Sequence, residues 1–303
     1  MYDKRLNDQL LRINERYQEL LHSDAFETNN KNKRYLKSLK KLNFLEIWKD
    51  LQYRKYAKQH FSQRGNVIIQ NTKYQEIESK KIAVYTCITG NYDKLIEPVY
   101  VEPNVDYYVF TDQMISTDSA WKKVDIVGDS FFQGLSPMMA NRKLKILQND
   151  MLMQYDYTVY IDGNIEIVAA VSPIIECMGK TKMAVHYHRS RDCIFDEVIS
   201  VKHLKKISGE DMDAQLECYR SEGFPEHFGL YENSILVRNN KDSSIKSLMN
   251  SWWSEMIKYP TRDQLSLPYV IWKFQFDKEL IYILGNDIER NATFNRIGEH
   301  RKK

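Results

Sequence analysis

The chain has 303 residues, of which 43% are hydrophobic and 28% are charged. This composition is ordinary for a globular protein, and the length suffices for a substantial core. No apolar run approaches the roughly 20 residues of a membrane span, and the charged N-terminus lacks a signal-peptide hydrophobic region, so we expect a cytoplasmic protein. The four cysteines form no CxxC pair, which predicts buried thiols rather than disulfides or a zinc site.

Charge is distributed unevenly along the chain. Residues 1–80 contain 17 Lys and Arg against 10 Asp and Glu, a net charge of +7 within an overall charge of +3. Heptad spacing in residues 1–22 and a Lys-rich apolar run over 34–61 predict a helical extension, followed by a polar linker. Such a basic helical region packs on the rest of the chain, forms a homo-oligomer, or lies on the anionic inner membrane surface. Nucleic acid is not an expected partner, because no recognisable reading module is present.

From residue 81 the chain alternates strand-like and helical segments. Strands are predicted at 82–88, 107–110, 124–127, 157–161, 183–187, 233–237 and 280–284, and helices begin near 136, 172, 193, 210, 244 and 263. This alternation predicts an α/β domain over 81–303 with a mostly parallel, doubly wound sheet. The glycine-rich signatures of dinucleotide-binding domains and P-loop NTPases are absent from the sequence, so those classes are disfavoured.

The central motif is Asp162-Gly163-Asn164, directly after the predicted strand at 157–161. Ligands bind at the carboxyl ends of strands in open α/β sheets. The oxygens of Asp162 and Asn164 can converge on a hard cation that grips a diphosphate, with Gly163 allowing the backbone to bend. The same residue types are also favoured in hairpin turns for purely local reasons, and that alternative stays open.

Other polar residues also follow predicted strands or begin helices. The candidates for binding the nucleoside are Thr89, Gly90, Asn91, Tyr92 and Asp112, with Tyr92 stacking on the base and Asp112 accepting a hydrogen bond from it or from the ribose. Arg142 and Lys143 are candidates for phosphate contacts, because Arg suits bidentate oxygen recognition and Lys acts as a point charge. A solvated helix face explains these two basic residues equally well.

Two further segments carry candidate chemistry. His186 and His188 are two residues apart on a strand and should therefore share one face. They are expected to contact an acceptor or phosphate together with Arg189, Arg191 and Asp192. A metallohydrolase built on the two histidines is an alternative. At 263, the aspartate either caps a helix or takes a proton from an acceptor hydroxyl.

Seven segments, in order, resemble a bacterial and plant family of glycosyltransferase-like domains whose plant members are linked to seed-mucilage pectin synthesis. They are AVYTCITGNYD (83–93), FTD (110–112), NRKLKIL (141–147), YIDGNIEI (160–167), HRSRDCIFDEV (188–198), GLYENSILVRNN (229–240) and TRDQLSLPYVIWK (261–273). The resemblance covers about 81–300 and leaves residues 1–80 outside.

The resemblance implies a GT-A type fold and transfer of a sugar from a nucleotide-diphosphate donor, most readily a UDP-sugar, to a glycan acceptor, with Mn²⁺ or Mg²⁺. It makes Asp162, Asn164 and His300 the metal ligands, although a neutral Asn164 ends the motif where the family pattern has aspartate. It places the acceptor at residues 228–233, which include Glu232, and makes Asp263 the catalytic base if the enzyme inverts. We expect a role in surface or capsular polysaccharide synthesis. The neutral Asn164 keeps a non-catalytic glycan-binding or scaffold module as the alternative.

Overall fold

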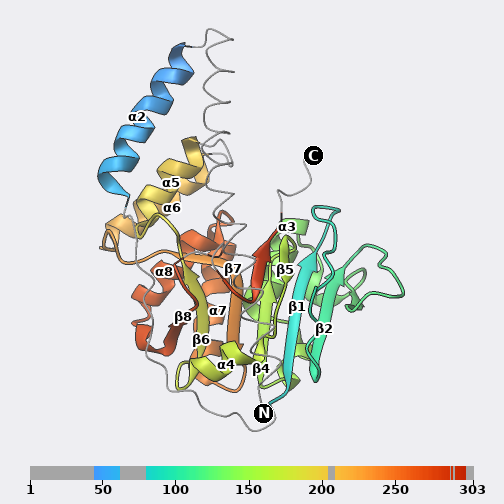
Figure 1. The fold of residues 1–303 in the computed structure, drawn as a ribbon. Coiled ribbons are helices and arrows are strands. Elements are labelled where there is room, and N and C mark those ends of the chain that lie inside the picture. The colour runs from blue at the N-terminus through green and yellow to red at the C-terminus, as the bar shows by residue number, and fades with distance from the viewer. Residues whose placement is uncertain (1–43, 62–79, 204–208, 287, 289–290, 298–303) are drawn as a thin grey trace.

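A seven-stranded sheet forms the centre of the protein, with strand order β3-β2-β1-β4-β7-β6-β8 (Figure 1). The computed structural model describes residues 44–61, 80–203, 209–286, 288 and 291–297. The strands of the large sheet are β1 (Ile82–Ile88), β2 (Val105–Thr111), β3 (Lys122–Asp125), β4 (Tyr157–Ile161), β6 (Met183–Tyr187), β7 (Tyr231–Asn239) and β8 (Ile281–Ile283). A separate two-stranded sheet pairs β5 (Ile165–Ile167) with β9 (Phe294–Arg296).

Most neighbouring strands of the large sheet run parallel. β3, β2, β1 and β4 form one parallel set, β6 and β8 form another, and β7 lies antiparallel between β4 and β6. The predicted α/β class with a mostly parallel sheet is therefore confirmed. Because β7 runs against β4, Ile161 pairs with Ile235. The end of β4 thus lies beside the beginning of β7.

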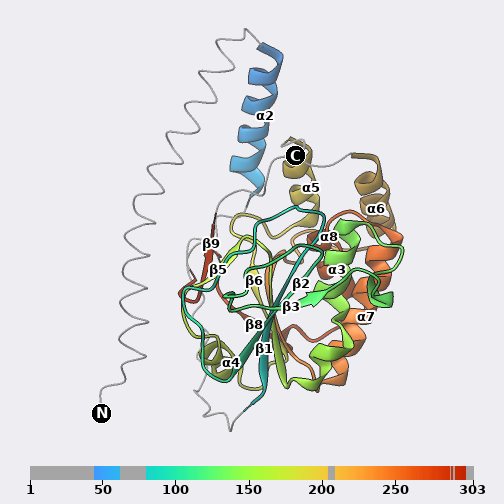
Figure 2. The ribbon, with the colours of Figure 1, turned by 90° about the vertical axis from the view of Figure 1, so that its right-hand side faces the viewer.

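Helices cover both faces of the large sheet (Figure 2). They are α3 (Pro137–Leu147), α4 (Ser172–Met178), α5 (Ile194–His203), α6 (Gly209–Ser221), α7 (Ser243–Lys258) and α8 (Asp263–Lys273), with short 3₁₀ helices at Ser130–Phe132, Asp150–Gln154 and Lys278–Leu280. Every residue of β1 is buried. Alternate side chains of this strand point to opposite faces, so Ala83 and Tyr85 pack with residues of α3, α7 and α8, whereas Val84 and Ile88 pack with residues of α4.

The start of α3 is determined by local sequence. The Ser136 hydroxyl accepts a hydrogen bond from the Met139 amide at 3.3 Å, and Pro137 occupies the first helical position. Both features are favoured at helix N-termini. The predicted helix start at Ser136-Pro137 is therefore confirmed. The first residue of α3 lies beside the carboxyl end of β1, since the Thr89 hydroxyl donates to the Pro137 carbonyl.

Helix α2 (Phe44–His60) packs against α5 (Figures 1 and 2). The hydroxyls of Tyr53 and Ser200 are 2.8 Å apart, and the Tyr56 hydroxyl donates to Asp196 Oδ1 at 2.8 Å. For α2, the predicted packing on the rest of the chain is thus observed, while the helix predicted at 1–22 and most of the predicted linker lie outside the described residues. None of the helices that the structure describes is long and apolar enough to cross a bilayer.

Candidate active site

Asp162, Gly163 and Asn164 form a tight turn after β4. The Ile165 amide donates to the Asp162 carbonyl at 3.0 Å, which closes the turn. The turn is not part of a hairpin, because β4 pairs with β1 and β7 whereas β5 pairs with β9. The hairpin alternative was therefore wrong. The motif instead leads the chain out of the large sheet, at the edge where ligands bind in open α/β folds.

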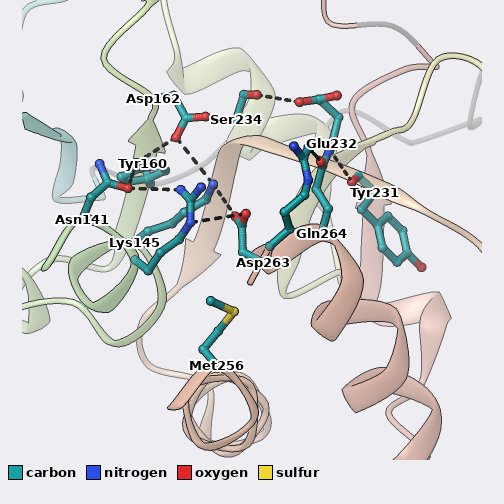
Figure 3. Close-up of polar contacts among 12 residues, drawn as sticks. Asn141, Lys145, Tyr160, Asp162, Tyr231, Glu232, Ser234, Met256, Asp263 and Gln264 are labelled. Carbon is teal, nitrogen blue, oxygen red and sulfur yellow. Dashed lines mark hydrogen bonds and ion pairs between the residues drawn. The ribbon is translucent and has the colours of Figure 1, made fainter. Parts of the chain in front are cut away.

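The Asp162 carboxylate belongs to a polar cluster at the end of β4 (Figure 3). Its Oδ1 accepts a hydrogen bond from the Tyr160 hydroxyl at 2.8 Å and lies 3.5 Å from Lys145 Nζ. The Asp162 side chain retains 25% exposure, whereas that of Lys145 retains only 2%. A buried ammonium group thus lies beneath a carboxylate that solvent or a ligand can reach.

Helix α3 directs two cations into this cluster. Arg142 and Lys145 are three residues apart and therefore lie on one helix face. The Lys145 ammonium is 2.7 Å from Asp263 Oδ2, and Arg142 Nε is 3.4 Å from Asp263 Oδ1. Lys143 points elsewhere, since its ammonium donates to the Phe131 carbonyl at 2.6 Å and lies 4.4 Å from the centre of that ring. The structure thus brings Arg142 and the unpredicted Lys145 to Asp263, but not Lys143.

Asp263 is the first residue of α8 and is only 5% exposed. It does not cap the helix, because the capping position belongs to Arg262, which makes no side-chain capping bond. Burial raises the pKa of the Asp263 carboxyl, but Arg142 and Lys145 more than offset this effect, so the pKa lies well below its usual range. Such a carboxylate stays ionised and has little driving force to accept a proton. The base role of Asp263 stays a prediction.

The predicted nucleoside-binding residues Gly90 and Asp112 meet at the ends of adjacent strands. β1 and β2 are parallel and in register, with Ile88 beside Thr111, so the residues after each strand lie at the same edge. The Gly90 amide donates to Asp112 Oδ2 at 3.0 Å. A hydrogen-bonded loop pair therefore borders the ends of β1 and β2.

The rest of the predicted nucleoside segment adjoins α3. The Thr89 hydroxyl donates to the Pro137 carbonyl at 2.8 Å, and Asn91 has a left-handed φ of 55°. The Tyr92 ring is 48% exposed. Partial burial and the charges of Asp93 and Asp162 raise the Tyr92 pKa, while Arg142 opposes this rise. Tyr92 is thus exposed, as base stacking requires, and lies near enough to the charged cluster for its charges to act on the hydroxyl.

Asp93 is a site neighbour that sequence reasoning missed. It is 8% exposed, and its carboxylate lies against Gly163 so closely that an added Cβ there would be 2.8 Å from Asp93 Oδ2. A second carboxylate therefore approaches the Asp162-Gly163-Asn164 turn from the segment after β1. Asp93 lies in the motif TGNYD, which the sequence analysis had noted. Its contact with Gly163 joins residues about 70 positions apart, so no local pattern predicts it.

Gly163→Ala is expected to lower the free energy of unfolding by about 1–3 kcal/mol, because overpacking of a tight site costs that much. The new methyl group would also lie 3.2 Å from Ile88 Cγ1. Urea denaturation of the variant and the parent protein measures the difference. Asn164→Ala is the matched control in the same turn, with an expected change within about 0.5 kcal/mol for a partly exposed residue. Equal losses in the two variants would contradict the steric explanation.

The two histidines of the predicted acceptor segment are buried and contact different partners. A bulge separates Val185 from His186, and His188 follows the end of β6. His186 is fully buried beside Asn291, with 2.9 Å between His186 Nε2 and Asn291 Nδ2, while His188 Nδ1 accepts the Arg191 amide at 3.2 Å. Burial lowers the pKa of His186 to about 3 and that of His188 to about 4. The register shift lies before His186, so it does not separate the two histidines, and a shared face for both rings stays a prediction. Each ring contacts a different partner, Asn291 for His186 and Arg191 for His188.

The other predicted acceptor residues separate into different surroundings. Arg191 donates to the buried Glu197 carboxylate at 2.6 Å, Asp192 Oδ1 is 2.8 Å from His227 Nδ1, and Arg189 is exposed. None of these contacts involves the Asp162 cluster. His300, predicted as a metal ligand, lies outside the described residues.

Glu232 is the predicted acceptor residue that adjoins the cluster. The Asp162 amide donates to the Ser234 carbonyl at 2.8 Å, and the Ser234 hydroxyl donates to Glu232 Oε1 at 2.8 Å (Figure 3). Arg296 of β9, which sequence reasoning missed, donates to the same Glu232 oxygen at 3.2 Å. The start of β7 thus adds a carboxylate and a hydroxyl to the edge that carries Asp162.

Comparison with known proteins gives the site its family context. The curated "Probable hexosyltransferase MUCI70" of Arabidopsis thaliana is 23% identical over 221 residues, which are 64% of this chain and 37% of that protein. The chain thus spans well under half of that relative's length. Among solved structures, the glycosyltransferase GlyE of Streptococcus pneumoniae TIGR4 has a TM-score of 0.35 at 12% identity, covering 68% of this chain and 45% of its own. The bifunctional glycosyltransferase WbbM has a TM-score of 0.38 at 12% identity, with 69% and 40% coverage.

These structural likenesses are too distant to support an argument, but the family match is extensive. The sequence matches the family described as TOD1/MUCI70, glycosyltransferase-like domain, over residues 52–300. The match begins within α2, so the family segment includes part of the extension that the sequence resemblance left outside. The sheet described above confirms the α/β class, and the GT-A type stays a prediction. Because the match covers most of its length, the chain belongs to the TOD1/MUCI70 family of glycosyltransferase-like domains.

Proposed function

We propose that the chain transfers a sugar from a nucleotide-diphosphate donor, a UDP-sugar, to a glycan acceptor in polysaccharide biosynthesis. The observation that carries this proposal is the gathering of Arg142, Lys145, Asp162 and Asp263 at the carboxyl end of β4. Family membership supports sugar transfer as the reaction class. The printed name of the plant relative, a probable hexosyltransferase, supports a hexose as the transferred group.

The donor diphosphate is proposed to bind where Asp162 is exposed. In the part of the chain that the structure describes, Tyr160 and Lys145 both contact Asp162 Oδ1, so we propose that the second carboxylate oxygen contacts the ligand. Beneath it, Lys145 and Arg142 supply positive charge in a poorly hydrated setting, where charges interact more strongly than in water. These two residues would hold the diphosphate and stabilise the negative charge that develops on it as the sugar leaves.

We propose that a divalent cation binds at this site with few protein ligands. Asp162 and Asn164 offer two oxygen ligands from the same turn, and the Asp93 carboxylate lies against Gly163 between them. Mg²⁺ commonly uses one or two carboxylates together with substrate phosphates and water, and Mn²⁺ also favours oxygen ligands. When bound, the cation would offset charge on the leaving diphosphate. Mn²⁺ or Mg²⁺ is therefore proposed to bind together with the donor.

Asp263 is proposed to change partners when the donor binds. In the structure it neutralises Lys145 and Arg142, and their charges keep its pKa low. Attraction of both cations toward the donor phosphates would weaken these pairs and raise the Asp263 pKa. The carboxylate could then take the proton of an acceptor hydroxyl, with Glu232 and Ser234 binding the acceptor at the start of β7.

Nucleotide binding and donor turnover together test the proposed function. UDP and UDP-hexoses are expected to raise the melting temperature, more strongly with Mn²⁺, because a ligand that binds only the folded state stabilises it. Asp162→Ala should lose this response. Slow release of UDP from a UDP-hexose should accompany binding in the parent protein. Binding without any UDP release would favour the non-catalytic glycan-binding or scaffold module, and absence of both responses across UDP-hexoses would contradict the proposal.

A further inference from the structure

A second polar cluster lies where α5 begins. One ligand atom from each of Cys193, Asp196 and His227 lies within 4.8 Å of the others. Cys193 directly precedes α5, Asp196 is in the first turn of that helix, and His227 lies between α6 and β7. Thiol, carboxylate and imidazole groups from two distant chain segments thus meet at one point, in a combination typical of transition-metal ligands.

Asp196 is only partly satisfied by the protein. The residue is 4% exposed, and its Oδ1 accepts the Tyr56 hydroxyl at 2.8 Å. Its Oδ2 is buried and has no hydrogen-bond partner in the part of the chain that the structure describes. Buried polar atoms almost always have a partner, because burying them unpaired costs free energy. A cation bound at this oxygen would supply the missing interaction.

His227 is oriented by a neighbouring carboxylate. Its Nδ1 lies 2.8 Å from Asp192 Oδ1. Histidines that bind metals usually donate their other ring N–H to a carboxylate or a carbonyl, which fixes the ring and strengthens the ligand. Asp192 also adds negative charge beside the cluster. The surroundings of His227 therefore match those of a metal-binding imidazole.

We propose that Cys193, Asp196 and His227 bind a zinc-class divalent ion, with water in the fourth position. Sulfur and nitrogen ligands favour Zn²⁺ over Mg²⁺ or Mn²⁺, which prefer oxygen. The ion would tie the start of α5, on which α2 packs, to the segment just before residues 228–233, the predicted acceptor loop. The expectation that the cysteines form no zinc site rested on spacing between cysteines, and this cluster uses only one of them.

Metal titration of the full chain tests the proposal. After removal of metals by chelation, the protein is expected to bind close to one equivalent of Zn²⁺, and Co²⁺ should produce a thiolate-to-metal absorption band. Asp192→Asn should weaken Zn²⁺ binding about 10- to 100-fold, the usual effect of losing an outer partner. His227→Asn should weaken it further, and Cys193→Ser should remove the Co²⁺ band.

The variants are chosen so that folding does not obscure the result. His227 is exposed and has a φ of 56°, a conformation that asparagine tolerates well. If Cys193→Ser fails to fold, the Zn²⁺ affinity of His227→Asn still tests the proposal. In the absence of donor, Cys218→Ser should leave Zn²⁺ affinity and the Co²⁺ band unchanged, as should Asp162→Ala, which alters only the proposed donor site. Zn²⁺ affinity that stays unchanged in His227→Asn, or absence of the Co²⁺ band in the parent protein, would overturn the proposal.

Discussion

Lys145→Met is expected to lower the free energy of unfolding by about 3–5 kcal/mol and the rate of sugar transfer by about 10²–10³-fold. Methionine keeps most of the side-chain volume but leaves the buried Asp263 with Arg142 as its nearest remaining cation, and breaking a buried ion pair from one side is costly. The loss in rate would reflect removal of a preorganised charge at the proposed diphosphate site. Chemical denaturation and UDP release from the donor measure the two effects.

Lys143→Met is the matched control on the same helix. Its ammonium contacts the Phe131 carbonyl rather than the charged cluster, so we expect a stability change below about 1 kcal/mol, the usual net value of one hydrogen bond, and nearly normal turnover. The pair of variants also tests the sequence-based assignment of Lys143 to the phosphates. Loss of donor binding in Lys143→Met but not in Lys145→Met would refute the site described here.

Asp263→Asn is expected to lower the free energy of unfolding by about 3–5 kcal/mol at neutral pH, because two cations lose their buried carboxylate partner. The Asp263 pKa is lowered in the folded protein, so its contribution is fully present above the unfolded value of about 3.9. That contribution is lost as pH falls through the lower folded pKa. The difference in free energy of unfolding between the parent protein and Asp263→Asn should therefore become smaller below about pH 4. Chemical denaturation at several pH values measures this difference.

Asp118→Asn, in an exposed loop, is the control for this substitution and should change stability by less than about 0.5 kcal/mol. A loss of stability in Asp263→Asn that is independent of pH would contradict the ion-pair account.

Kinetic measurements separate the two possible roles of Asp263, general base and positioning residue. Loss of a general base lowers kcat by about 10²–10⁴-fold with donor affinity intact, whereas loss of a residue that only positions cations weakens donor binding as well.

Local sequence signals predicted much of the framework. Some features depend only on residues close together in the chain, so they could be predicted without coordinates. They are the apolar run before Asp162, the helix start at Ser136-Pro137 and the alternation of strands and helices. The family motifs then indicated the reaction class. Asp162 was predicted because a strand end is also the ligand-binding edge of this type of sheet, and its position at the end of β4 agrees with that reasoning.

The missed features depend on contacts between distant segments. Helical spacing could have paired Arg142 with Lys145 instead of Lys143, but which helix face meets the site depends on how α3 packs. The antiparallel direction of β7 depends on the path of the whole chain. β9 has only three residues and is stabilised by pairing with β5, so it has little local signature. The Cys193 and His227 cluster likewise forms only through tertiary structure.

The packing of α2 on α5 has a consequence for folding during protein synthesis. Tyr56 and its partner Asp196 are 140 residues apart in the chain, and Tyr53 and Ser200 are 147 apart. At about 5–20 residues per second, α2 emerges from the ribosome roughly 7–30 s before its partner helix. A 17-residue helix is only marginally stable alone. Tyr53 and Tyr56 therefore have no partner helix during that interval.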